Sequence, residues 1–401
     1  MKILVNIVRV IVGLLFIFSG LVKANDPLGL SYKMQEFFEI WGMTRFNSLT
    51  LTLSVLMNAF EIIAGFALLV GWRIRLFSWL LLLLIIFFTF LTGYAFLSGK
   101  FRSCGCFGDC LPITPKTSFL KDVALLILIG FLFWKQRLIQ PVFSRTVSLA
   151  AIAGVTILSF GMEWYALTHL PFVDCLPYKK GSNITQKMQM PPNAVKDSTV
   201  ITFVYEKAGQ KVEFTADKFP ADFNGETYKL IKRYDKIVRP GKNNTPLITG
   251  FHLIALSKNE QGEDVDSTEI ILVQPYAVLL FCEDFSVPVS KWEKQFAKVY
   301  AAAMAKNIPA YLITTQPDKA LQKLSATAFK NIQVLKCDYT AIRTAARTNP
   351  CVYILKQGTV VDKWSRFGFS AATGLLESLS TQPKPVFIEP TTDSTGAAPV
   401  Q

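Results

Sequence analysis

Three cysteines lie within seven consecutive residues of the segment FRSCGCFGDCLPITPKTSFLKD, which covers residues 101–122. Glycines and a proline surround Cys104, Cys106 and Cys110, and such residues are typical of a turn rather than of a buried strand. Thiolates attack disulfides, bind metal ions and close in pairs into disulfide bonds. The segment therefore predicts an exposed loop with redox, structural or metal-binding chemistry.

Each kind of chemistry makes its own demand on the loop. As a redox site it would exchange with a partner or a quinone, with Asp109 relaying protons and Arg102 lowering a thiol pKa. As a structural site, one pair of cysteines, or a bond to Cys175, would only hold the loop in place. As a metal site, the three thiolates and Cys175 would bind zinc, although C-x-C-x₃-C is an irregular spacing for zinc. The exposed turn and its basic neighbours favour the redox interpretation, and the other two stay open.

The composition indicates a membrane protein with an additional globular part. Of the 401 residues, 51% are hydrophobic and 18% are charged, an imbalance too great for one soluble domain. The apolar residues concentrate before about residue 168, and the rest reads as an ordinary globular sequence. Much of the net charge of +13 lies in short loops between apolar segments, and no soluble segment interleaves a basic run with aromatic residues. We therefore expect no nucleic-acid binding.

Five segments are apolar and long enough to cross a bilayer as helices. They are residues 3–22, 49–70, 76–97, 119–134 and 147–167. The fourth is short, but lysine and arginine side chains at its ends can extend to the membrane surface. The first resembles a cleaved secretory signal, but four further spans follow it and favour an uncleaved anchor. The predicted membrane fold is an all-α bundle of five transmembrane helices.

Positive residues between the spans predict the orientation of the bundle. Lysines and arginines flank the first span and fill the second and fourth loops, which places these loops and the amino terminus in the cytoplasm. The third loop, with Lys100, Arg102 and Lys116, is basic too and fits less well. Five spans bring the chain after residue 168 to the face of the cysteine loop. We expect a multi-pass protein of the bacterial inner membrane, in contact with lipid, with an extracytoplasmic carboxy-terminal half.

Two ionisable residues lie inside or beside the predicted bilayer. Glu61 occupies the middle of the second span, where a carboxylate is costly unless it is protonated or paired. Lys23 ends the first span and is a candidate partner. The pair could fix the helices against each other or form a proton or quinone site, and both alternatives stay open.

The segment after the transmembrane domain (1–168) is a linker with β-structure, residues 169–275. Cys175 lies just outside the fifth span, so the outer surface holds four cysteines, an even number suited to two disulfides in an oxidising compartment. Further along, TVITFVYEKAGQKVEFTADKFP alternates apolar and polar residues around Ala208-Gly209 and predicts a β-hairpin.

Strands and helices alternate over residues 276–382, with one of the helices predicted over 324–331. The alternation ends in a hairpin and a helix, which is the element order of a thioredoxin-type α/β sheet. Residues 383–401 are rich in proline, threonine and alanine and predict a disordered tail.

The membrane half resembles the MauE/DoxX group of bacterial membrane proteins. The resemblance rests on FSGLVKANDPLGLSYKMQEFFE, NAFEIIAGFALLVGW and above all CGCFGD followed by TSFLKDVALL. It implies a small helical bundle, which in the MauE branch serves methylamine utilisation through maturation of a periplasmic amine dehydrogenase, with a thioredoxin-like companion in disulfide formation. The wider group is linked to quinone or thiosulfate redox chemistry, so a quinone is the candidate cofactor. The positions that carry the resemblance are Lys23, Glu61, Cys104, Cys106, Asp109 and Asp122.

Residues 276–382 resemble a thioredoxin fold through DYTAIRTAARTNPCVYILKQGTVVDKW, which implies a cis peptide bond before Pro350 at a loop facing the active site. The external half has no Cys-x-x-Cys, and where the redox pair is expected the sequence reads FCEDFSVP, with Cys282 alone. A mixed disulfide needs a second thiol to resolve it, which makes dithiol exchange by this domain alone doubtful. Cys351 could approach Cys282, provided that their Cα atoms lie within about 7 Å. Cys337 ends a strand and is expected to be a core thiol.

These observations predict a membrane protein that supports extracytoplasmic thiol–disulfide or electron transfer through its cysteine loop, with a thiol protein as partner. The alternative is a non-enzymatic membrane scaffold whose degenerate thioredoxin-like domain binds a protein partner. His169 and His252 are the only histidines of the sequence and lack the spacing of metal ligands or of a catalytic triad, so no metal is expected.

Overall fold

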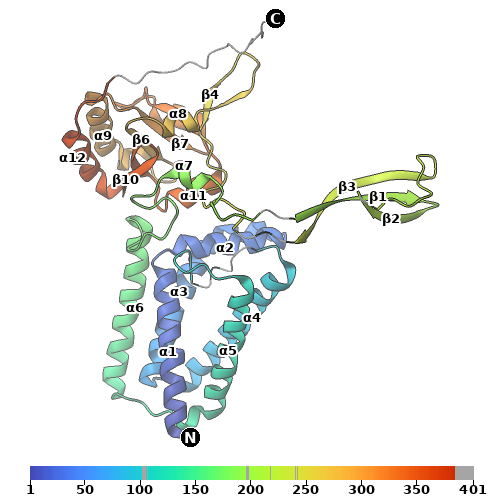
Figure 1. The fold of residues 1–401 in the computed structure, drawn as a ribbon. Coiled ribbons are helices and arrows are strands. Elements are labelled where there is room, and N and C mark those ends of the chain that lie inside the picture. Colours follow the sequence, from blue (N-terminus) through green and yellow to red (C-terminus); the bar gives the residue numbers. More distant parts are fainter. Residues whose placement is uncertain are drawn as a thin grey trace, which may run out of the picture.

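The structure is a computed structural model that describes residues 1–101, 105, 107–195, 198–216, 218–239, 241 and 243–383. Within these residues, five long apolar helices stand together and carry an α/β domain at the end opposite to the amino terminus (Figure 1). The five are α1 (Lys2–Ala24), α3 (Thr50–Val70), α4 (Ile74–Ser98), α5 (Pro115–Lys135) and α6 (Arg145–Thr168). All five predicted spans are confirmed, as is the α/β domain that follows them.

Caps in the sequence set the boundaries of the spans. Thr114 accepts a hydrogen bond from the backbone N–H of Thr117 and precedes a proline at the first position of α5. Ser144 accepts from the N–H of Val147 and starts α6 in the same way. Gly71 ends α3 with a φ of 75°, a conformation that favours glycine.

Glycines bring α1 and α3 into close contact. A Cβ atom at Gly65 would lie 2.7 Å from the backbone oxygen of Gly13, and one at Gly20 would lie 3.0 Å from the backbone oxygen of Asn58. Small residues let membrane helices approach in this way. The approach places the end of α1, with Lys23, against the middle of α3, with Glu61.

Helix α2 (Pro27–Ile40) lies across the domain end of the bundle (Figure 1). It lies between the first two predicted spans, where the sequence pattern predicted no helix. Asp26 caps the helix by accepting the N–H of Gly29 at 3.2 Å, and Pro27 is pre-set for the first turn. A short 3-10 helix, η1 (Thr44–Leu49), leads on to α3.

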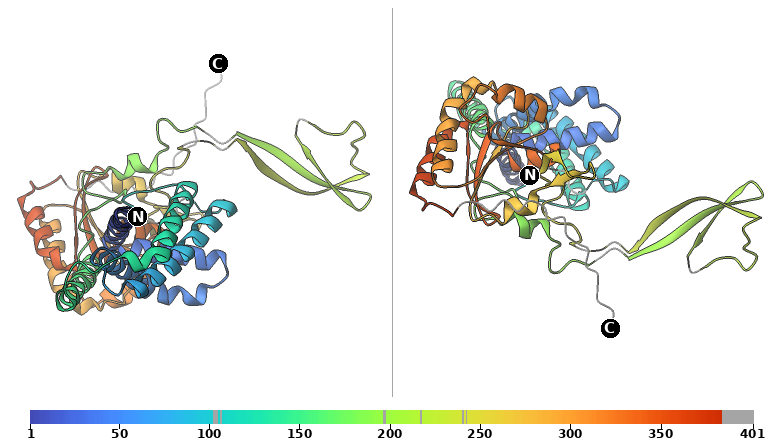
Figure 2. Two further views of the ribbon diagram at one scale, coloured as in Figure 1. Left: turned by 90° about the horizontal axis from the view of Figure 1, so that it is seen from below. Right: turned by 90° about the horizontal axis from the view of Figure 1, so that it is seen from above.

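A three-stranded antiparallel sheet projects sideways from the body, as Figure 2 shows. Strands β1 (Ser198–Lys207) and β2 (Gln210–Thr215) form the predicted hairpin, with Ala208 and Gly209 both at positive φ, as a two-residue turn requires. Strand β3 (Tyr228–Arg239) pairs with the other edge of β1, where the sequence analysis predicted no strand. An aromatic cluster comprises Phe203, Tyr205, Phe214, Phe219, Phe223 and Tyr228.

The α/β domain is built on a seven-stranded sheet in the order β10-β9-β6-β7-β8-β4-β5. Its strands are β4 (Ile254–Lys258), β5 (Asp264–Asp266), β6 (Ala277–Phe281), β7 (Ala310–Thr314), β8 (Gln333–Lys336), β9 (Cys351–Lys356) and β10 (Thr359–Ser365). Strands β6, β7 and β8 run parallel, and β9 and β10 form the predicted hairpin. Because β4 and β5 pair with this sheet, the α/β domain begins before residue 276, inside the segment that we assigned to the linker.

Six helices accompany the large sheet. They are α7 (Ile184–Met188), α8 (Thr268–Leu272), α9 (Glu293–Ala305), α10 (Pro317–Leu324), α11 (Tyr339–Ala345) and α12 (Phe369–Ser378). The helix predicted over residues 324–331 was placed too late in the chain. Pro317 starts α10, and the hydroxyls of Ser325 and Thr327 bond carbonyls of the last turn, which favours an end there.

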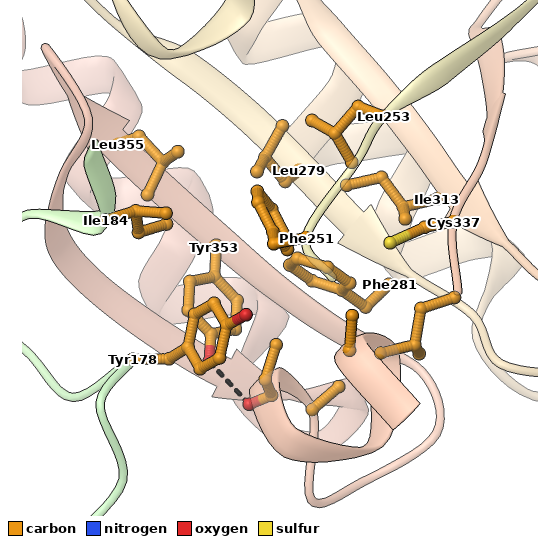
Figure 3. Close-up of a cluster of buried hydrophobic side chains, with 14 of the residues drawn as sticks. Tyr178, Ile184, Phe251, Leu253, Leu279, Phe281, Ile313, Cys337, Tyr353 and Leu355 are labelled. Carbon is orange, nitrogen blue, oxygen red and sulfur yellow. Dashed lines mark hydrogen bonds between the residues drawn. The ribbon is translucent and has the colours of Figure 1, made fainter. Parts of the chain in front are cut away.

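Two apolar cores cover the two faces of the large sheet. One joins α9, α10 and α12 to the sheet, and the other lies under α7, α8 and α11. Figure 3 shows the second core, in which Tyr178 and Ile184 of the linker pack with Phe251 and Phe281. There the hydroxyl of Tyr353 donates to the carbonyl of Ala345 at 2.6 Å, which ties α11 to β9.

Candidate thiol site at the junction of the two halves

A disulfide joins Cys110 to Cys175, with a Cα–Cα distance of 4.8 Å. It connects the loop between α4 and α5 to the linker after α6, directly at the domain end of the bundle. Both cysteines are half-buried. A zinc site of four thiolates would need these two sulfurs apart, so this bond disfavours the metal interpretation. Cys104 and Cys106 lie outside the described residues.

Asn25 positions this disulfide, and sequence reasoning missed it. Its side chain accepts from the N–H of Val173 at 2.9 Å and donates to the carbonyl of Val173 at 2.8 Å. The same amide nitrogen lies 4.0 Å from the sulfur of Cys110. Asn25 is 5% exposed and directly follows α1, so a polar residue between a span and a helix cap was the available signal.

Arg347 links the α/β domain to two parts of the membrane half. Its Nε lies 2.8 Å from Asp26 and its Nη2 lies 2.7 Å from Asp109, while the side chain is only 4% exposed. Burial disfavours the charge of Arg347, but the two carboxylates raise its pKa above the usual value. Burial raises the pKa of Asp26, and Arg347 opposes that shift. Asp109, which we expected to relay protons, is held in this ion pair beside Cys110.

Arg343 forms a second link, one turn earlier on α11. Its Nε lies 2.8 Å from Glu283 and its Nη1 donates to Gln35 on α2 at 2.7 Å. The guanidinium also stacks on Tyr339 and faces Tyr32, with ring-centre distances of 3.5 and 4.6 Å. Burial raises the pKa of Glu283 despite this arginine. The spacing of the two arginines, one on α11 and one just after its end, was the signal for a docking face.

Two cavities flank these arginine links. A cavity of about 540 Å³ is lined by Cys175, Asp109, Tyr32 and the two arginines, and thus gives access to the disulfide. A second cavity of about 480 Å³ lies on the other side and is lined by Pro350 together with the ends of α3 and α6. Tyr32, Gln35 and both arginines line both cavities and therefore form the wall between them.

The bond between Asn349 and Pro350 is cis, as the resemblance implies. The segment after β6 lies beside it, because the side-chain nitrogen of Asn349 donates to the carbonyl and the carboxylate of Asp284, at 3.0 and 2.7 Å. Both segments face the membrane half across the second cavity.

The described cysteines of the α/β domain are free, and the proposed Cys282–Cys351 pair is not formed. Phe281 and Cys351 are register partners and share one core, whereas Cys282 packs in the other. Neighbouring strand residues point to opposite faces, so the sheet separates the two thiols. Burial raises the pKa of Cys282, and raises that of Cys337 and Cys351 to about 12. Such thiols are protonated and unreactive.

Polar residues inside the bundle form a separate group. Lys23 and Glu61 form a fully buried ion pair, and Asp122 accepts from Thr92 at 3.0 Å and pairs with Lys121. Lys23, Glu61, Lys121 and Asp122 line one small cavity of about 40 Å³. The sequence analysis missed Glu163 on α6, which is fully buried.

Comparisons with known proteins cover parts of the chain. Residues 1–135 match the family of methylamine utilisation protein MauE, and residues 199–240 match a domain of unknown function. Over 130 residues, the chain is 25% identical to protein TlpB of Flavobacterium psychrophilum; that stretch is 32% of this chain and 35% of TlpB. No solved structure matches. Residues 1–135 are thus similar to MauE, in agreement with the residues quoted above.

Proposed function

We propose that this protein exchanges disulfides with an extracytoplasmic thiol protein. Its membrane domain is similar to MauE, and the cysteine loop of that domain is bonded to the linker beneath an α/β domain. Cys110 and Cys175 are the exchanging pair, and Cys104 and Cys106 lie shortly before Cys110 in the sequence. One observation carries this proposal: the Cys110–Cys175 bond borders an open cavity of about 540 Å³, while the described thiols of the α/β domain are buried.

The charges support an extracytoplasmic position of this site. The opposite end of the bundle carries the positive residues that favour the cytoplasm. They are Lys2, Arg73, Arg75, Lys135, Arg137 and Arg145. A disulfide also persists best in an oxidising compartment such as the periplasm.

The exchange needs no cofactor for its balance. A partner thiolate attacks the sulfur of Cys175, which lines the cavity; the Cys110–Cys175 bond breaks, a mixed disulfide forms, and Cys110 leaves as a thiolate that takes up a proton. A second partner thiol resolves the mixed disulfide and frees Cys175. The partner loses two electrons and the Cys110–Cys175 pair gains them. A disulfide between Cys104 and Cys106 would restore the bond by the same exchange.

In this proposal the thioredoxin-like domain holds the site rather than reacting itself. Arg347 and Arg343 fix α11 on α2 and set the width of the cavity. The described cysteines of the α/β domain are buried in its two cores. This observation favours the alternative function, a scaffold whose α/β domain binds a protein and whose disulfide is a structural bond.

Mass mapping after differential alkylation tests the proposal. We would equilibrate the folded protein with graded dithiothreitol and measure the fraction of Cys110–Cys175 that is reduced. We expect reduction under mild conditions. After the reductant is removed without oxygen, one equivalent of oxidised glutathione should restore the bond more slowly in a Cys104→Ser/Cys106→Ser variant than in the parent. A Cys337→Ser variant is the control and should behave as the parent. A bond that survives until the protein unfolds would decide for the scaffold.

A further inference from the structure

The cavity of about 480 Å³ beside Pro350 has charged groups that the protein itself does not neutralise. Several of its charges are paired: Arg343 with Glu283, and Arg347 with Asp26 and Asp109. These groups belong to the links already described. The remaining charged groups of the cavity lining have no oppositely charged partner among the described residues, and a ligand would bind to them.

Asp284 is one of these groups. It is half-buried, and its carboxylate accepts from the amide nitrogen of Asn349 at 2.7 Å and from the hydroxyl and N–H of Ser286 at 2.6 and 3.0 Å. All of these donors are neutral. No lysine or arginine pairs with Asp284 among the residues that the structure describes. The carboxylate therefore presents an uncompensated negative charge to the cavity.

Arg366 is the second group, and it carries the opposite sign. It lies in the 3-10 helix η4 (Arg366–Gly368), is half-buried, and faces the ring of Phe367 at 4.7 Å. Within the described part of the chain it has no carboxylate partner. An anion in the cavity would complete its hydrogen bonds.

Two amide oxygens in the cavity wall also lack a donor. Oδ1 of Asn349 and Oδ1 of Asn47 are buried without a hydrogen bond in the described residues. The nitrogen of Asn349 is committed to Asp284, which fixes the orientation of that amide. Both oxygens are enclosed, so Asp284 and Arg366 are the groups that define which ligand the cavity can bind.

We propose that this cavity binds a zwitterionic group, with an ammonium at Asp284 and a phosphate or carboxylate at Arg366. A phospholipid with a primary amine, phosphatidylethanolamine, has this chemistry, and so does a free amino acid. The position favours the lipid, because Thr50 and Leu51 begin α3 and Leu167 and Thr168 end α6. The ends of spans lie at the depth of lipid head groups. This inference does not depend on thiol exchange.

Lipid retention tests the proposal without any activity assay. We would reconstitute the full chain in nanodiscs of equimolar phosphatidylethanolamine, phosphatidylcholine and phosphatidylglycerol, re-extract it gently and quantify bound lipid by native mass spectrometry. We expect enrichment of phosphatidylethanolamine, since the choline head group has no N–H donor and the glycerol head group has no cation. Asp284→Asn should reduce the enrichment roughly tenfold, the weight of one charge-assisted hydrogen bond. Arg366→Gln should reduce the total retained lipid by a similar factor, because all three lipids carry a phosphate.

Matched controls separate the site from general charge effects. Arg75→Gln and Asp318→Asn change exposed charges outside the cavity and should retain the lipid as the parent does. Equal retention of the three lipids by the parent would overturn the proposal. An Asp284→Asn variant that keeps the enrichment, or an Arg366→Gln variant that keeps the total retained lipid, would overturn it too. Binding of free glycine or phosphoethanolamine in detergent, without lipid enrichment, would overturn the lipid source. Circular dichroism confirms that each variant is folded.

Discussion

The junction between the two halves and the interior of the α/β domain place cysteine in opposite settings. At the junction, Cys110 and Cys175 are half-buried, bonded to each other and surrounded by charged residues. In the interior, Cys282, Cys337 and Cys351 are buried and free, and burial raises the pKa of each thiol. Because the reactivity of a thiol follows its thiolate content and access, the buried thiols are inert, whereas the disulfide at the junction borders a cavity.

The difference shows how the α/β domain can support the junction without a reactive cysteine pair of its own among the described residues. The sheet keeps its cis-proline loop, and its arginines dock that loop on the membrane half. The domain thus contributes a charged, fixed surface, and the membrane half contributes the disulfide.

The largest effect is expected for a variant that removes the ion pair between the two halves. Arg347→Ala leaves Asp26 buried without a cation, and losing one partner of a buried ion pair costs about 3–5 kcal/mol. We expect a lower unfolding temperature in detergent and faster proteolysis of the linker. Arg347→Lys is the control, because it keeps the charge but cannot reach both carboxylates, and should give a smaller loss. An unchanged unfolding temperature for Arg347→Ala would mean that the two halves do not depend on this link.

Removal of the disulfide comes next. Cys110→Ser and Cys175→Ser each open a bond that spans 65 residues, and the expected loss of stability is about 2–4 kcal/mol. The double variant should lose no more than either single variant, because both remove the same bond. Thermal unfolding of the three proteins measures this. Additive losses would show that the sulfurs act separately.

A smaller effect is expected for a thiol of the interior. Cys351→Ala removes a buried sulfur from a packed core and should cost about 1 kcal/mol, while Cys351→Ser should cost more because it buries a hydroxyl. Neither change should alter the redox behaviour of Cys110 and Cys175. Chemical unfolding and mass mapping check the two parts. If either variant shifted the reduction midpoint of the Cys110–Cys175 bond, the packing of the interior would affect the disulfide at the junction.

The smallest effect is an absence of reaction. At pH 8 the folded protein should not react with iodoacetamide at Cys337 and Cys351, because pKa values of about 12 leave both thiols protonated. The unfolded chain holds these protons less tightly, so stability should fall as the pH rises from the ordinary value of 9.0 towards 12. Iodoacetamide labelling with and without denaturant measures the reactivity of the two thiols, and chemical unfolding at several pH values measures the stability. Rapid labelling of the folded protein would place a thiol at the surface.

Local patterns allowed much of the fold to be predicted. Runs of about 20 apolar residues identify spans because lipid cannot solvate a backbone, and the turn at Ala208-Gly209 identifies a hairpin. The apolar pattern did not predict α2, because that helix depends on the polar cap at Asp26. It did not predict β4 and β5 either, because these strands depend on pairing with a distant strand. Cys104 and Cys106 were identified as candidates by spacing alone and remain predictions.

The sequence by itself determined which cysteines are crowded, which segments cross the membrane and that no Cys-x-x-Cys follows the first strand of the domain. The tertiary structure decided which sulfurs meet. Cys110 and Cys175 bond because two loops converge at one end of the bundle, and Cys282 and Cys351 stay apart because adjacent strand positions face opposite sides of a sheet. The charges that join the halves follow the same rule: Asp26, Asp109 and Arg347 are distant in the chain and adjacent only once it has folded.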